Sequence, residues 1–168
     1  MLYLREMNLK DSRQEYEFFI KLPQEENGFV NPYFNISYLE FVNTEIAKRL
    51  QDSKSMEIRN NHVPETYYFL WKDYDIIGLY KVRHFLTEEL KNGSGHIGYA
   101  ILPSERGKGY GTKGLAMVLE KARDIIAEDE FYLCCNQDNS CSLKVMLHNQ
   151  AYIHHRDNPY IYTRIKKE

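Results

Sequence analysis

The sequence predicts a mixed α/β (α+β) fold in which a mainly antiparallel central sheet is flanked by helices. Three observations predict it: strand-type runs joined by a short turn in the middle of the chain, helical apolar spacing on both sides of them, and an ordinary globular composition. The chain has 168 residues, of which 43% are hydrophobic and 27% charged, and this suffices for one hydrophobic core. Because no repeat or linker-like segment divides the chain, we expect residues 1–168 to form a single domain.

The first fifty residues are expected to hold one strand and two helices. A short strand is predicted over Leu2–Met7, and Asp11–Lys21 is predicted as a helix capped by its first residue. Pro23–Pro32 is rich in Glu, Asn and Gly, which predicts a loop. Ser37 with Glu40 three residues later forms a capping box, and the apolar spacing that follows predicts the second helix.

The rest of the chain is expected to form strands first and then to alternate between helices and strands. A polar loop over Asp52–Pro64, with Asn60-Asn61 in a turn, leads to an aromatic strand over Thr66–Trp71. A four-residue polar turn joins it to a strand over Ile76–His84, which predicts an antiparallel hairpin. The elements expected after it are a connector over Phe85–Gly95, a strand over His96–Leu102, a helix over Gly109–Ala127, a strand over Glu130–Cys135, a helix over Ser140–Asn149, and paired strands over Tyr152–His155 and Pro159–Ile165.

The composition gives no sign of a nucleic-acid or membrane partner. The formal net charge is −2, no apolar run approaches the roughly 20 residues of a membrane span, and the N-terminus lacks a signal peptide's apolar stretch. Cys134, Cys135 and Cys141 are odd in number and lack zinc-site spacing, so we expect free thiols and no metal. We therefore expect a cytoplasmic protein.

The segment from Arg106 to Thr112 carries the most chemical information. It lies between the strand that Pro103 closes and the predicted helix, and it contains three glycines within five positions, Gly107, Gly109 and Gly111. Glycine permits turns that other residues avoid and lets a ligand approach the backbone closely. The first amides of a helix lack internal partners and the helix dipole favours an anion. This pattern predicts a pyrophosphate-binding turn.

Other glycine patterns overlap this segment. Gly109–Gly114 fits the dinucleotide pattern G-x-G-x-x-G, but that site needs a parallel βαβ unit and an acidic residue after its second strand, where this chain has Cys134-Cys135-Asn136. The order of a nucleoside-triphosphate loop is absent. A nucleotide-binding module, and a helix that begins with glycines only for tight packing, remain as alternatives.

At these residues the chain resembles the GNAT superfamily of N-acetyltransferases. Arg106–Gly111 fits the signature R/Q-x-x-G-x-G/A. The run His96–Gly111, with Arg83-His84 before it and Asp138-Asn139-x-x-Ser142 after it, is similar to a bacterial branch of predicted acetyltransferases. The resemblance covers about Thr66–Ile165 and implies a GNAT-like sheet, with the N-terminal helices shaping the acceptor site.

The resemblance implies acetyl-CoA as co-substrate. A bulge that splays the cleft strand from the next one would open the binding cleft. The strand edge would pair with the pantetheine arm, and Asn139 would contact it, although capping the next helix is an equally ordinary role for this residue. The implied cofactor-binding residues are Tyr99, Ala100, Ile101, Arg106, Gly107, Lys108, Gly109, Tyr110, Gly111, Thr112 and Asn139.

The implied reaction is acetyl transfer to an amine of a small molecule or protein by direct attack, which needs no covalent intermediate. His96 is the candidate base, with His84 as a second candidate and water as a third; His96 could instead hold the strand by hydrogen bonds. Many GNAT enzymes carry a tyrosine seven residues after the asparagine, where this chain has Met146. Tyr152 is the candidate acid, with Tyr160 as another.

Met146 leaves a second function open, a catalytically silent acyl-CoA-binding sensor. The oligomeric state is expected to be a monomer or homodimer. Acidic residues in the N-terminal region could favour an amine acceptor or form a solvated surface, namely Glu25, Glu26, Glu40 and Glu45.

Overall fold

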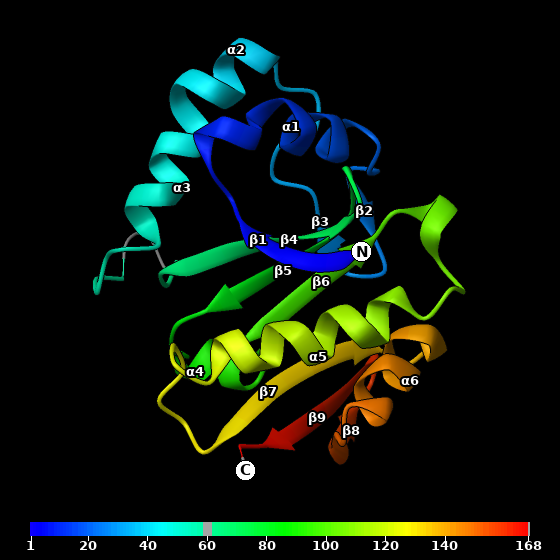
Figure 1. Ribbon diagram of the computed structural model, residues 1–168. Helices are drawn as coiled ribbons and strands as arrows, with labels where there is room; N and C mark the ends of the chain where they lie inside the picture. The colour runs from blue at the N-terminus through cyan, green and yellow to red at the C-terminus, as the bar shows by residue number, and fades with distance from the viewer. Residues whose placement is uncertain (59–61, 168) are drawn as a thin grey trace.

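The computed structural model describes residues 1–58 and 62–167 and confirms the predicted fold class, with helices on both sides of antiparallel sheets (Figure 1). Three sheets are present in these residues: four strands in the order β1-β4-β5-β6, three in the order β7-β9-β8, and the short hairpin β2–β3. The expected turn at Asn60-Asn61 lies outside the described residues. The strands are β1 (Leu2–Glu6), β2 (Glu25–Glu26), β3 (Phe29–Val30), β4 (Glu65–Lys72), β5 (Asp75–Arg83), β6 (Ile97–Ile101), β7 (Glu130–Asn136), β8 (Tyr152–Asp157) and β9 (Tyr160–Lys166).

The helices divide between the two faces of the four-stranded sheet. α1, α2 and α3 cover one face and α5 covers the other, between this sheet and β7 (Figure 1). None of the described helices is both long and apolar enough to span a membrane. The helical segments are η1 (Leu9–Asp11), α1 (Ser12–Ile20), α2 (Tyr38–Glu40), η2 (Phe41–Glu45), α3 (Ile46–Asp52), α4 (Glu88–Lys91), η3 (Pro103–Glu105), α5 (Tyr110–Ala122) and α6 (Ser140–His148).

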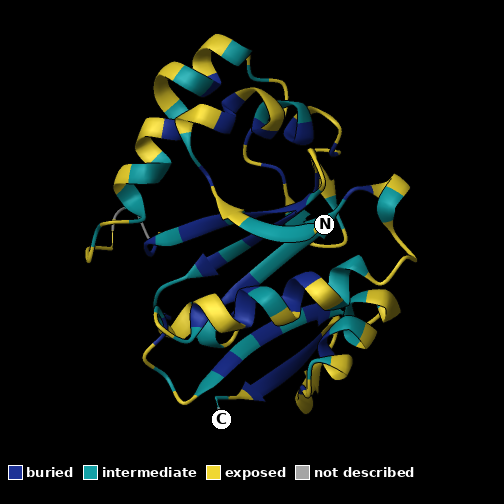
Figure 2. Ribbon diagram, viewed as in Figure 1, coloured by how far each residue is buried: buried dark blue, intermediate teal, exposed yellow. Residues whose placement is uncertain are grey.

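Two hydrophobic cores lie on the two sides of the four-stranded sheet. One joins α1, η2 and α3 to β4 and β5 through Phe18, Phe41 and Phe69. The other joins α5 to the sheets through Leu115 and Tyr80. In Figure 2 the buried residues accordingly follow the strands and the inward sides of the helices. Burial of this apolar surface is the main stabilising contribution to the arrangement.

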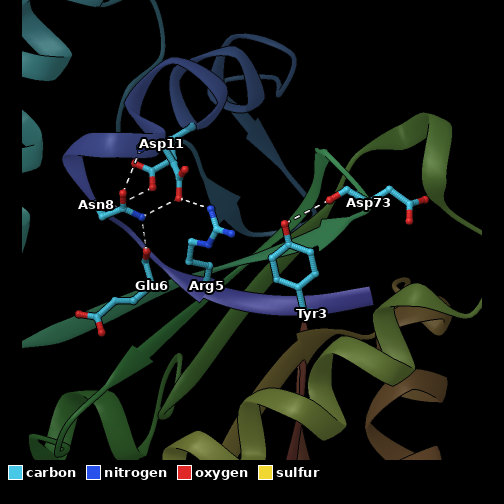
Figure 3. Close-up of polar contacts among 7 residues, drawn as sticks. Tyr3, Arg5, Glu6, Asn8, Asp11 and Asp73 are labelled. Atoms are coloured by element: carbon cyan, nitrogen blue, oxygen red, sulfur yellow. Dashed lines mark hydrogen bonds and ion pairs between the residues drawn. The ribbon is translucent and has the colours of Figure 1, made fainter. Parts of the chain in front are cut away.

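Two predicted helix caps have different outcomes. The backbone N–H of Glu40 donates to Ser37 Oγ at 3.1 Å, which confirms the capping box. Asp11 occupies the cap position of α1, but its side chain makes no capping bond. Figure 3 shows the reason: the Asp11 carboxylate accepts from Arg5 at 2.7 Å and from Asn8 Nδ2 at 2.9 Å. The ion pair with β1 therefore takes the place of the cap.

The strands β6 and β7 touch at one end and then separate into different sheets. The N–H of His96 donates to the Tyr132 carbonyl at 2.7 Å. A Cβ on Gly95 would lie 2.3 Å from that carbonyl, so only glycine allows the close approach. Beyond this contact, β6 is the edge strand of the four-stranded sheet and β7 is the edge strand of the three-stranded sheet. The expected bulge is absent from the paired part of β6, because its register with β5 is continuous from Gly78↔Ile101 to Val82↔Ile97; the separation follows from the divergence of the two sheets.

Candidate functional site

The cradle, residues 106–112, lies where β6 ends and α5 begins. Gly107 and Gly109 have φ angles of 74° and 78°, in the left-handed region that favours glycine. A Cβ at either position would meet no atom within 4 Å. These glycines are thus required by the backbone conformation, and the space above them is open to a ligand.

The amides at the start of α5 are free of helical acceptors, as expected at a helix N-terminus. Gly109 is the N-cap and has no side chain to accept from them. The first amide with an acceptor inside the helix is that of Lys113, which donates to the Gly109 carbonyl at 3.2 Å. The amides before it and the positive end of the helix dipole form a site suited to an anion.

Close packing explains two further glycines of the segment. A Cβ on Gly114 would lie 2.2 Å from Tyr80 Oη, and one on Gly111 would lie 3.2 Å from Val145 Cγ2. The Tyr80 hydroxyl donates to the Gly111 carbonyl at 3.0 Å. Tight packing against β5 and α6 therefore fixes the first turn of α5 and gives the cradle a rigid support.

The two cations of the cradle are held by acceptors of the protein. Arg106 Nε donates to the Ile101 carbonyl at 3.0 Å, and its guanidinium binds the Glu26 carboxylate of the β2–β3 hairpin, with NH1 at 3.0 Å from Oε1. Lys108 Nζ donates to the Ser104 carbonyl at 2.8 Å and lies 3.2 Å from Glu105 Oε1. The hairpin is thereby tied to the cradle by a surface ion pair, in which the Glu26 side chain remains 37% exposed.

The outer edge of β6 has no strand partner among the described residues, because β6 ends the four-stranded sheet. Tyr99, Ala100 and Ile101, the predicted strand edge, lie on this strand between the cradle and the contact with β7. Tyr99 also reaches α6, where its hydroxyl lies 2.7 Å from Ser142 Oγ. A free edge beside an anion site can accept an extended, amide-containing ligand.

Asn139 is the N-cap of α6. Its Oδ1 accepts from the backbone N–H of Ser142 at 3.0 Å, so the capping role is confirmed. The capped helix begins opposite Tyr99, beside the free edge of β6. The contact with pantetheine stays a prediction.

His96 lies where β6 and β7 touch and is fully buried. Its Nδ1 accepts from the backbone N–H of Tyr132 at 3.0 Å, and its Nε2 faces Glu128 at 3.3 Å. Burial lowers the pKa of His96 to about 4, which the neighbouring carboxylate of Glu128 offsets only in part. This placement favours the strand-holding role. His84, the second candidate, lies 2.8 Å from Thr66 Oγ1, and burial lowers its pKa as well.

The two tyrosine candidates lie at opposite ends of the three-stranded sheet. Tyr152 starts β8, and its hydroxyl donates to Glu130 at 2.8 Å, at the beginning of β7. Tyr160 instead pairs with Asn136, at the end of β7 that lies beside Gly28, the tip of the β2–β3 hairpin. Because strands rise about 3.3 Å per residue, roughly 20 Å of strand separates the two ends. Tyr160 therefore lies at the end of this sheet near the hairpin tip and Tyr152 at the other end, and an acid role for either residue stays a prediction.

Neither Met146 nor the two cysteines of β7, Cys134 and Cys135, provides a reactive group. The Met146 side chain is buried in the core, where Thr163 Oγ1 donates to its sulfur at 3.1 Å. Burial raises the pKa of the Cys134 thiol to about 11 and also raises that of Cys135, while Cys141 is exposed. In the described part of the chain, no three His, Cys, Asp or Glu residues are grouped to hold a metal.

Residues that the sequence did not single out connect the β2–β3 hairpin to β5 and β7. The hairpin tip Gly28 lies against Asn136, since a Cβ there would be 3.6 Å from Asn136 Oδ1. Lys81 of β5 donates to the Val30 carbonyl of the hairpin at 3.0 Å. The hairpin therefore crosses from β5 to the end of β7, and no sequence motif signals these contacts because the partners are far apart in the chain.

Comparisons with known proteins agree with this geometry. Residues 2–151 match a family model described as an acetyltransferase (GNAT) domain. A comparison with curated proteins finds no match. Similar solved structures include a GNAT-family acetyltransferase from Streptococcus pneumoniae (14% identity, TM-score 0.64, covering 98% of this chain and 97% of that one). The ribosomal-protein-S5-alanine acetyltransferase from Vibrio fischeri is also similar (15%, TM-score 0.70, 98% and 92%).

A third similar structure is the aminoglycoside acetyltransferase AAC(6')-Ib in complex with coenzyme A (14% identity, TM-score 0.65, covering 99% of this chain and 95% of that one). At such identities the likeness shows a shared fold, and the acceptors in these names belong to those proteins.

Proposed function

Since the chain belongs to the GNAT acetyltransferase family, we propose that it transfers an acetyl group from acetyl-CoA to an amine of a small molecule or protein. The observation that carries the proposal is the juxtaposition of an open cradle with a free strand edge. Gly107 and Gly109 leave room above the free amides of α5, and the unpaired edge of β6 begins beside them. A pyrophosphate joined to an amide-bearing arm fits both features.

Acetyl-CoA supplies the reactive thioester, and the chain supplies binding and orientation. The amides of residues 107–112 would hold the pyrophosphate, with Arg106 and Lys108 adding positive charge. The edge at Tyr99–Ile101 would pair with the amides of pantetheine, and Asn139 would lie beside it. Holding the thioester in place makes the attack of a bound amine effectively intramolecular.

The transfer proceeds by direct attack in this proposal. The amine nitrogen forms a bond to the acyl carbon, the carbon–sulfur bond breaks, and the thiolate leaves with coenzyme A. Water accepts the proton of the amine, because the Nδ1 lone pair of His96 is already used by the Tyr132 N–H. Tyr160 protonates the thiolate, which is supported by its position opposite Asn136 at the cleft end of β7.

The rival function is a catalytically silent acyl-CoA-binding sensor. The observation that favours it is Met146, which is buried in the core and offers no hydroxyl at that position of α6. A sensor needs the cradle and the free edge but no acid. The two functions therefore predict the same binding and differ in turnover.

Two measurements test these functions in order. A ligand that binds only the folded state raises the melting temperature, so excess acetyl-CoA should stabilise the protein. Release of free thiol in the presence of an amine panel then shows turnover. Stabilisation without thiol release from any amine would identify the sensor, and no stabilisation at high excess would refute both functions.

A further inference from the structure

The face of the four-stranded sheet that carries α1–α3 is open beside the strand edge of β6. Tyr99 and Ile101 pack in the core under α5, whereas Ala100 packs in the core under α1–α3. Side chains alternate along a strand, so Gly98 shares the face of Ala100. A Cβ on Gly98 would meet no atom within 4 Å. A reactant can therefore approach β6 from the face opposite α5.

Lys81 borders this opening. It pairs with Gly98 in the β5–β6 register. Its Nζ donates to the Val30 carbonyl at 3.0 Å and lies 4.3 Å from the centre of the Phe29 ring, so the hairpin holds the ammonium in place. An ammonium has three donors, and Val30 is its one hydrogen-bond partner among residues 1–58 and 62–167. Two donors are left for a ligand.

The charges around Lys81 sum to an excess of positive charge. The Glu65 carboxylate forms ion pairs with two arginines, with Oε1 at 2.7 Å from Arg49 NH1 and Oε2 at 3.9 Å from Arg83 Nε. Among the described residues, these three groups have the main electrostatic effects on Lys81. Three cations against one carboxylate leave a net charge of +2. Burial of the ammonium and the two guanidiniums lower the pKa of Lys81 to about 8, and a bound anion would relieve this repulsion.

Resting on the proposed function, we propose that Lys81 is a specificity-determining residue that binds a carboxylate of the acceptor. The acceptor is then an amine that also carries a carboxylate, as an amino acid does, and polyamines are disfavoured by the same positive charge. Lys81 exchanges no proton and forms no bond in the reaction. The carboxylate is assigned to the acceptor because Lys81 lies on the sheet face opposite α5, whose N-terminus forms the cofactor cradle.

The test compares matched amines that differ by a carboxylate. We would measure thiol release from acetyl-CoA with β-alanine against propylamine, phenylalanine against phenethylamine, and spermidine. Wild type should prefer the carboxylate-bearing member of each pair. Lys81→Met should lower kcat/KM for that member about 10- to 100-fold, mainly through KM, and should lower kcat/KM for the plain amine much less. Lys81→Arg should retain part of the preference, and Lys121→Met, on the exposed side of α5, should behave as wild type.

Several outcomes would overturn the inference. An equal loss for both members of a pair would show that Lys81 acts only by holding the hairpin. Equal or better use of propylamine or spermidine by wild type would refute the inference and leave the acetyltransferase function standing. If succinyl-CoA replaces acetyl-CoA as the better donor in a Lys81-dependent way, the carboxylate belongs to the acyl chain. If no amine releases thiol, the proposed function and the inference both fail.

Discussion

Gly114 of α5 is the position at which the packing that supports the cradle can be perturbed most directly. A Cβ there would lie 2.2 Å from Tyr80 Oη and 2.7 Å from Tyr80 Cζ, and Cβ contacts below 3.0 Å are essentially never seen. Tyr80 is fully buried and donates to the Gly111 carbonyl. Its ring cannot move away without giving up that bond, so Gly114→Ala should push α5 off the sheet.

The magnitude follows from two opposing effects. Overpacking at a contact as close as 2.2 Å belongs to the upper part of the usual cost range, about 2–3 kcal/mol, and alanine in place of glycine in a helix returns about 1 kcal/mol. We expect a net loss of about 1–2 kcal/mol, which lowers the melting temperature by roughly 2–8 °C for a chain of this size. Affinity for acetyl-CoA should fall as well, because the first turn of α5 carries the cradle amides. Calorimetric unfolding and titration would measure both.

A double-mutant cycle tests the reasoning. Tyr80→Phe removes the closest collision, that of Oη with the new Cβ, and leaves the Cζ contact of 2.7 Å. It also loses one hydrogen bond, at about 1 kcal/mol, so the ring is free to shift away from the new Cβ. The double variant Tyr80→Phe with Gly114→Ala should therefore be less destabilised than the sum of the single variants. Gly98→Ala, where a Cβ meets open space, is the control for stability and should cause no loss. Additive effects, or a Gly114→Ala variant as stable as wild type, would refute this account.

Three further predictions concern titration and catalysis. Burial raises the pKa of Glu15 to about 8, which is above its value in the unfolded chain. The contribution of the protonated Glu15 to the free energy of unfolding is therefore full below about pH 4.5 and is lost as the pH rises through 8. The loss is up to about 1.4 kcal/mol per pH unit. Unfolding free energies of Glu15→Gln should lack this decline, and an unchanged pH dependence would count against it. His96→Gln should lower stability while the acidic limb of the pH–rate profile persists; its disappearance would make His96 the base. Tyr160→Phe should reduce kcat roughly 100-fold or more, with Tyr152→Phe as the matched control; similar effects of both would reject the role of Tyr160.

Elements defined by local patterns could be predicted from the sequence. The β4–β5 hairpin follows from two strand-type runs around a polar turn, and α5 follows from its apolar spacing. The predicted helix continued to Ala127 because the spacing persists there, although α5 ends at Ala122. The left-handed glycines of the cradle were predictable because only glycine adopts that backbone at little cost.

Elements defined by distant contacts could not be predicted. The β2–β3 hairpin lies in the segment predicted as a loop, and each strand has two residues. It is held by the pair between Glu26 and Arg106, eighty positions apart, which no local pattern encodes. The burial of His96 and the position of Lys81 also depend on strand register, so the sequence offered a histidine as the base and gave no signal for the lysine.

The central claim, that the cradle binds the pyrophosphate of acetyl-CoA, is tested most directly by titration calorimetry of acetyl-CoA into wild type and two variants of Gly109. Gly109 has a φ of 78°, and both Asn and Asp tolerate this region better than most residues. Gly109→Asn thus controls for backbone strain and bulk, while Gly109→Asp adds a negative charge where the pyrophosphate is expected. We predict saturable one-to-one binding by wild type, weaker binding by the Asn variant, and at least a further tenfold loss with Asp, roughly 1.4 kcal/mol. Absence of binding by wild type, or equal affinity of the Asp variant and wild type, would contradict the claim.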